Sequence, residues 1–262
     1  MRFNAILVSM TCLFFDIECA NSFGGIGKIC SFGYVLCEYD SGTQNPQNFT
    51  VLETDDILMN PGVQFDWYLF KKGSKCQLTH SRSEYQRQPK FPEFYERIRE
   101  LLRAKDRLVF GFGCKNDVAT ITTECLRYNL PQIEFSCHDM HPLAEKHCEM
   151  QGGLSAFVEK LGIETEGMEF HDSRADAWFT MKVTERLAKD SGKTLENMLT
   201  GCTPYESKHI LQEQVKKLYR KWLERTSTKK TADGKPHRTP KKLSVPDWFD
   251  SRKELLFQIQ KN

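Results

Sequence analysis

The stretch "TCLFFDIEC", residues 11–19, joins an apolar run to two acids, Asp16 and Glu18. Its apolar and β-favouring residues predict a buried strand. Residues two apart on a strand project from the same face, so the two carboxylates share one side. Adjacent carboxylates at the end of an apolar strand repel each other and resist burial. A divalent cation such as Mg²⁺ or Mn²⁺ offsets both costs, because it prefers hard oxygen ligands. An exposed strand end with two solvated acids is the open alternative.

The composition is that of an ordinary globular protein, with 262 residues of which 39% are hydrophobic and 27% charged. This length allows one domain, or one domain with an appendage. No apolar run approaches the roughly 18–20 residues of a membrane span, so we expect no membrane partner. The ten cysteines form no CxxC pair, which favours reduced thiols and a cytoplasmic location.

A signal peptide is the competing interpretation of the N-terminal region, since Arg2 precedes the apolar residues 5–15. The apolar segment runs directly into Asp16 without a small-residue cleavage site. The scattered cysteines also argue against export. We therefore interpret the segment as a strand.

The net charge of +2 hides an asymmetry along the chain. Residues 203–262 contain fifteen basic and seven acidic residues, a net charge of +8. Residues 1–202 contain 22 basic and 28 acidic residues, a net charge of −6. An acidic body with a basic extension indicates a polyanionic partner. A solvated, partly disordered tail explains the charge equally well.

Strand and helix signals alternate along the chain. Strands are expected at residues 11–19, 29–40, 49–61, 107–113 and 132–140. Helices are expected at residues 91–105, 115–129, 152–163 and 172–192, with an irregular polar stretch at about 62–90. This order predicts an α/β domain over residues 1–202, with a mixed sheet flanked by helices and an antiparallel meander first. In the extension, residues 203–262, we expect a basic helix at 205–225, a linker at about 226–242 and a helical cap at 245–260.

Three further residues are candidates for the same site as Asp16 and Glu18. Asp117 follows the strand at 107–113 and lies in the first turn of a helix, where an acid complements the helix dipole. His171 and Asp176 are five residues apart around the start of the helix at 172–192. His171 then lies just before the helix and Asp176 one turn inside it. Taken singly, each has an ordinary structural explanation.

Taken in order, these residues resemble a known pattern. The carrying segments are "FFDIEC" (14–19), "VFGFGCKNDVATI" (109–121) and "FHDSRADAWFTMKV" (170–183). Together they resemble the DEDDh exonucleases, ribonuclease-H-like 3′→5′ exonucleases that include the proofreading subunit of bacterial DNA polymerase III. The spacing from His171 to Asp176 is that of the DEDDh branch; the other branch has Tyr where Asp172 stands here. The resemblance covers about residues 11–190, and its middle motif is closer to the RNA-directed members.

The resemblance implies a set of catalytic residues. Asp16, Glu18, Asp117 and Asp176 correspond to ligands of two divalent cations, Mg²⁺ or Mn²⁺, and His171 corresponds to the general base. The implied activity is hydrolysis of phosphodiester bonds at the 3′ end of single-stranded DNA or RNA, with release of nucleoside 5′-monophosphates. Two clamped metal ions suit this chemistry, and a neutral imidazole can take the proton of the attacking water. The alternatives are a catalytically silent nucleic-acid-binding or polymerase-associated scaffold of the same fold, and a structural domain with coincidental acids.

Substrate contacts are expected in two regions. The resemblance implies Ile17, Cys19 and Asn116 near the terminal nucleotide, although Cys19-Ala20-Asn21 replaces the family's usual Thr-Thr-Gly and Ser173 replaces an Ala. In the basic helix, the cations expected to follow a phosphate backbone are Lys216, Lys217 and Arg220. A docking element for a replication, repair or RNA-processing protein is the other interpretation of the extension.

Overall fold

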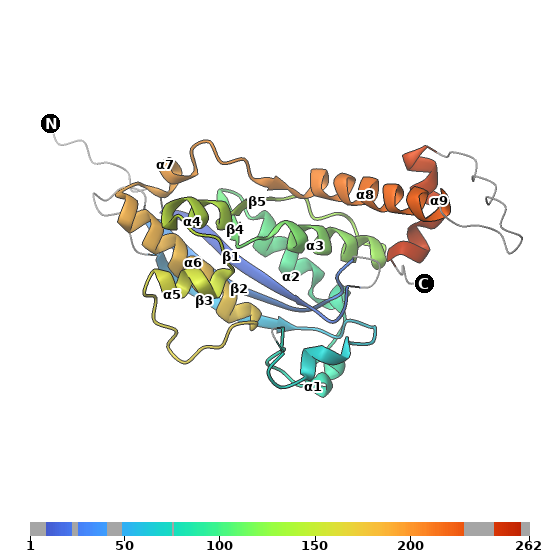
Figure 1. Ribbon diagram of the computed structural model, residues 1–262, viewed down its shortest axis with the longest axis horizontal. Coiled ribbons are helices and arrows are strands. Elements are labelled where there is room, and N and C mark those ends of the chain that lie inside the picture. The colour runs from blue at the N-terminus through green and yellow to red at the C-terminus, as the bar shows by residue number, and fades with distance from the viewer. Residues whose placement is uncertain (1–8, 23–25, 41–48, 75, 228–243, 258–262) are drawn as a thin grey trace, which may run out of the picture.

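Strand β1 (Ser9–Cys19) lies inside a six-stranded mixed sheet of order β3-β2-β1-β4-β5-β6. The computed structural model describes residues 9–22, 26–40, 49–74, 76–227 and 244–257 (Figure 1). β1 pairs antiparallel with β2 (Ile29–Asp40), which pairs antiparallel with β3 (Phe49–Leu58). On its other side β1 pairs parallel with β4 (Arg107–Gly111), which pairs parallel with β5 (Ser136–Asp139). The predicted meander and mixed sheet are confirmed.

The alternation of side chains along β1 creates a separate core on each face of the sheet. Leu13, Phe15 and Ile17 pack with α2 (Phe91–Arg103) and α3 (Lys115–Arg127). Cys12 and Phe14 pack with α5 (Leu154–Lys160) and α6 (Ser173–Ser191). Even-numbered residues of β1 therefore face α6, because strand side chains alternate between faces.

Several short elements lie outside the expected ones. They are η2 (Trp67–Phe70), α1 (Arg82–Arg87), α4 (His141–Cys148), α7 (Leu195–Leu199) and β6 (Tyr205–Glu206). The stretch 62–90, expected to be irregular, contains η2 and α1. A capping box joins Ser81 and Glu84 at the start of α1, which lets a six-residue helix form in a polar segment.

The C-terminal extension packs along the domain rather than away from it (Figure 1). β6 pairs antiparallel with β5 at the edge of the sheet, so α8 (Ser207–Ser227) starts two residues later than expected. α8 contacts α3, and α9 (Val245–Phe257) contacts both. The linker expected at 226–242 lies almost wholly outside the described residues, and the division at residue 202 stays a prediction. Within the described parts of the chain, none of the helices has the length and apolar character needed to cross a membrane.

Candidate active site

Asp16 and Glu18 lie at the carboxyl end of β1 on the face covered by α6, as the alternation of β1 predicts. The start of α6 comes very close to the sheet at this point. Asp16 pairs in register with Gly33 of β2, and a Cβ atom added to Gly33 would lie 2.0 Å from the backbone N of Arg174. Only glycine permits this approach, since real Cβ atoms are never so close to backbone atoms. The contact brings the first turn of α6 to the carboxyl end of β1, where the two acids lie.

Glu18, His171 and Asp176 form a compact cluster, with one ligand atom of each lying within 4.8 Å of the others. The backbone N–H of His171 donates to Oδ2 of Asp176 at 3.1 Å. His171 has a φ of 67°, in the left-handed region that few non-glycine residues adopt. Asp172 caps α6 by accepting from the N–H of Ala175 at 2.9 Å. The expected placement of His171 before α6 and of Asp176 one turn inside it is what the structure has.

Asp117 reaches the site from the first turn of α3. β4 is parallel to β1, so its carboxyl end and the turn that follows lie at the same edge of the sheet as Asp16. In that turn Gly113 has a φ of 65° and its N–H donates to Oδ1 of Asp139 at 2.8 Å. Asp117 lies near enough to Asp16 to affect its ionisation. The negative charge of Asp117 raises the pKa of Asp16 more than any other single charge does.

Burial raises the pKa of all four carboxyls, and repulsion by the other site acids adds to this effect for Asp16 and Glu18. The pKa of Asp16 lies well above its usual range, through burial first and then the charges of Asp117, Asp176 and Glu18. Burial and the Asp176 charge raise the pKa of Glu18 to about 8. Burial and the charge of Asp139 raise the pKa of Asp117 to about 7. Burial also raises the pKa of Asp176 to about 7, although the hydrogen bond from the backbone of His171 lowers it. A site that raises so many carboxyl pKa values is built for positive charge.

The donor set fits divalent cations. Oδ1 of Asp176 is buried and has no hydrogen-bond partner among the described residues, and a buried acceptor without a partner is costly. Four carboxylates offer hard oxygen ligands at one place, which suits Mg²⁺ or Mn²⁺. The residues that would hold the ions are Asp16, Glu18, Asp117 and Asp176.

A second polar cluster supports the start of α6 and was not anticipated from the sequence. Oδ1 of Asp56 on β3 accepts from the hydroxyls of Ser31 and Ser173, the latter at 2.7 Å. Oδ2 of Asp56 lies 3.3 Å from Nε2 of His80. This cluster gives the hydroxyl of Ser173 a hydrogen-bond partner. No spacing in the sequence pairs Asp56 with His80 or Ser173, since the three lie in segments far apart in the chain.

The residues expected to contact substrate lie in different parts of the structure. The Ile17 side chain is buried in the core on the face opposite Asp16, as its odd number on β1 dictates. Cys19 is half-buried and lines a hollow together with Asn116 and Asp117. The basic residues of α8 are exposed and line an adjoining groove that also includes Lys115 and Asn116; they are Lys216, Lys217 and Arg220.

The fold is that of known 3′ exonucleases. No model of a protein family matches the chain, and no curated protein is similar to it in sequence. Among solved structures, the nuclease domain of 3′hExo, a DEDDh family member bound to rAMP, aligns with a TM-score of 0.55 at 16% identity over 72% of this chain and 96% of that domain. A structure of exonuclease I aligns with a TM-score of 0.56 at 14% identity over 73% of this chain and 43% of that one. A 3′-exonuclease described in 3′-end-specific recognition of a histone mRNA stem-loop aligns with a TM-score of 0.55 at 14% identity over 72% of this chain and 66% of that one.

These structural likenesses define the fold of the chain. The chain has the ribonuclease-H-like fold of the DEDDh 3′ exonucleases, as the three sequence motifs predict. The chain spans slightly less than two thirds of the histone mRNA exonuclease and less than half of exonuclease I. At these identities the likeness defines the fold, and the activity of this chain is a proposal.

Proposed function

We propose that this protein is a metal-dependent 3′→5′ exonuclease that removes nucleoside 5′-monophosphates from single-stranded DNA or RNA. The observation that carries the proposal is the convergence of five side chains from three distant segments. Glu18, His171 and Asp176 lie within 4.8 Å of one another, and the charges of Asp117 and Asp176 act on Asp16. A structural domain with coincidental acids has no reason to gather repelling carboxyls in this way.

Each residue has a task in the reaction. Two divalent cations, when bound by the four carboxylates, would activate a water, neutralise charge on the phosphate and stabilise the leaving oxygen. Burial lowers the pKa of His171, so its ring is neutral at pH 7 and takes a proton from the attacking water. The water oxygen bonds to phosphorus and the bond to the 3′ oxygen breaks. The shortened strand keeps a 3′ hydroxyl, and the released nucleotide keeps a 5′ phosphate.

The test is an end-labelled degradation assay on the full chain. A 5′-labelled single-stranded DNA and an RNA of the same sequence are incubated with Mg²⁺ or Mn²⁺, next to the Asp16→Asn variant. We expect stepwise shortening from the 3′ end by the wild type and a loss of at least a hundredfold in the variant. Equal rates for wild type and variant would overturn the proposal. Binding without shortening would favour the catalytically silent module instead.

The thiols are consistent with a reducing compartment. All ten cysteines are free in the structure, and burial raises the pKa of several of them, Cys12, Cys19 and Cys30 included. Buried thiols of raised pKa are poor nucleophiles and do not compete with the water attack. We therefore propose a cytoplasmic enzyme, and a label-based localisation experiment tests this.

A further inference from the structure

Two adjoining hollows lie along α3 and α8. One hollow, of about 230 Å³, is lined by Cys19 and Asp117 and continues past Thr120. The other, of about 470 Å³, is lined by side chains of both helices. The two share Asn116, Ala119 and Gln214, so they adjoin each other along α3 and α8, and we treat them together as one groove.

The two ends of the groove differ in chemistry. One end reaches Asp117, one of the four carboxylates of the candidate active site, with Cys19 beside it. The other end is basic and is lined by Lys216, Lys217 and Arg220 of α8. These three lie on one face of α8, since residues three and four apart on a helix are neighbours. The groove thus extends from Asp117, one of the four candidate carboxylates, to a cluster of positive charges on α8.

The basic wall is held firmly in place. The opposite face of α8 packs against α9 through three aromatic rings, with Trp248 fully buried 5.2 Å from Tyr219 and 5.9 Å from Trp222 between ring centroids. Ile26, which follows β1, joins the same cluster. A salt bridge of 2.8 Å between Lys115 of α3 and Glu213 of α8 ties the two walls together. The packing of α8 against α3 and α9 therefore determines the positions of these basic side chains.

We propose that this groove is the path of the nucleic-acid strand, with the 3′ end at the carboxylates and the upstream phosphates along Lys216, Lys217 and Arg220. The inference rests on the proposed function and adds the route and the contacts of the substrate. The occupant is a single strand, the substrate of the proposed function, and its phosphates complement the positive charges of α8.

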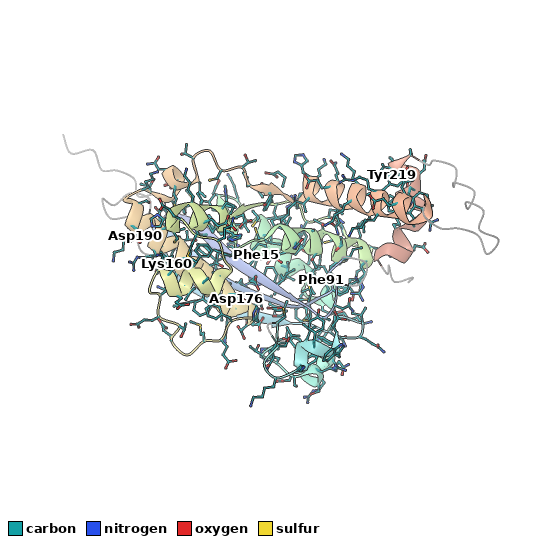
Figure 2. The ribbon with its side chains drawn as sticks, in the orientation of Figure 1. Phe15, Phe91, Lys160, Asp176, Asp190 and Tyr219 are labelled. Atoms are coloured by element: carbon teal, nitrogen blue, oxygen red, sulfur yellow. The ribbon has the colours of Figure 1, made fainter. Side chains whose placement is uncertain are left out.

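Binding to a strand without cleavage tests the path directly. The full-length wild type, the variant Lys216→Ala/Lys217→Ala/Arg220→Ala and a control are titrated in EDTA against fluorescein-labelled dT12 and U12 at several salt concentrations. The control is Lys160→Ala/Lys189→Ala/Lys193→Ala, which removes the same charge from exposed positions away from the groove. Figure 2 places Lys160 and Tyr219 of α8 towards opposite ends of the long axis of the molecule.

We expect the α8 variant to lose at least tenfold in affinity at low salt. The slope of log K against log salt concentration should become shallower by about 2, because three phosphate contacts on a single strand are lost. The control variant should keep the affinity and slope of the wild type. The same affinity and slope in the α8 variant as in the control would overturn the inference and leave the basic face to a protein partner. A difference between dT12 and U12 identifies the preferred backbone.

Strand length provides a second readout. With Mg²⁺, the loss of kcat/KM in the α8 variant should grow from a dinucleotide to a 12-mer, since only the longer strand reaches α8. A loss that is independent of length would contradict the path. Failure of the proposed function has a different signature, because the wild type itself would then shorten no strand of any length. Thermal melting is the control for folding. Both triple variants should melt like the wild type, because the substituted side chains are exposed.

Discussion

His171 serves the site through two different groups. Its backbone N–H holds Asp176, and its ring lies within reach of the same carboxylates. Substitution can separate these roles, because a side-chain change leaves the N–H in place. Asn is the best replacement, since it tolerates the left-handed backbone found at this position.

We expect His171→Asn to lower kcat by a factor of about 10²–10⁴, the usual contribution of a general base. The carboxylates remain, so the rise in melting temperature on adding Mn²⁺ should persist. Single-turnover rates on a 5′-labelled strand and thermal melts with and without Mn²⁺ measure the two effects. An unchanged rate would remove His171 from the chemistry.

The raised carboxyl pKa values predict how the metal-free protein responds to pH. A carboxyl whose pKa is raised by folding binds its proton more tightly in the folded state, so stability falls as the pH rises from the unfolded pKa to the folded one. With unfolded values near 4 and folded values of about 7 for Asp117 and Asp176 and about 8 for Glu18, the decline spans roughly pH 4–8. In EDTA, the melting temperature should therefore fall between pH 5 and pH 8.

Adding Mn²⁺ at pH 8 should reverse this loss, because the cations offset the repulsion. Asp16→Asn is the matched comparison: it should melt higher than the wild type in EDTA at pH 8, and gain less from Mn²⁺. Melting curves that are flat with pH in EDTA would show that the four acids are not brought together as described.

At the scale of elements, the packing of α6 on β2 determines whether the site forms. The start of α6 touches the sheet at Gly33, and the hydroxyl of Ser173 is held by Asp56 from β3. These contacts place Asp176 opposite Asp16 although 160 residues separate them in the chain. The geometry of the site therefore depends on how α6 packs against β2 and β3.

Gly33→Ser should destabilise the protein by about 1–3 kcal/mol or more, since its Cβ would push α6 off the sheet. Activity should fall further than stability alone explains, because Asp176 and His171 move with the helix. Gly153→Ser is the control: a Cβ there meets nothing within 4 Å, and Ser is a good residue for the N-cap of α5. Denaturant unfolding and the degradation assay measure both variants. Equal stability of the two would contradict the close approach.

At the scale of the whole molecule, two cores lie on the faces of the sheet, and a separate apolar cluster anchors α8 and α9. Ile26, Leu218, Tyr219 and Trp248 form that cluster. This cluster keeps α8 beside α3, and the groove lies along these two helices. In the described residues, the basic side chains of α8 therefore lie beside α3 of the sheet domain.

Trp248→Ala should cost about 3–5 kcal/mol of packing around α8 and α9. With α8 loosened, affinity for a 12-mer should fall more than the rate on a dinucleotide does. Trp67→Ala is the matched control, because Trp67 is 71% exposed and its removal should change stability little. Anisotropy titrations and thermal melts compare the two. Equal affinity for the 12-mer in both variants would mean that α9 does not position the basic wall.

The sequence by itself determined the local features of this protein. Alternation along β1 placed Asp16 and Glu18 on one face, and helix periodicity with end signals placed His171 and Asp176 around the start of α6. These features follow from the geometry of single strands and helices, which neighbouring residues dictate. The order of strands and helices then predicted a mixed sheet with an antiparallel meander, and the motifs predicted the exonuclease fold.

Only the tertiary structure decided how those features meet. The need for glycine at position 33, the support of Ser173 by Asp56 and the pairing of β6 with β5 all join residues distant in sequence. The same holds for the groove between α3 and α8, whose walls are almost one hundred residues apart. Such contacts depend on how complete elements pack against one another, and no local period encodes that packing.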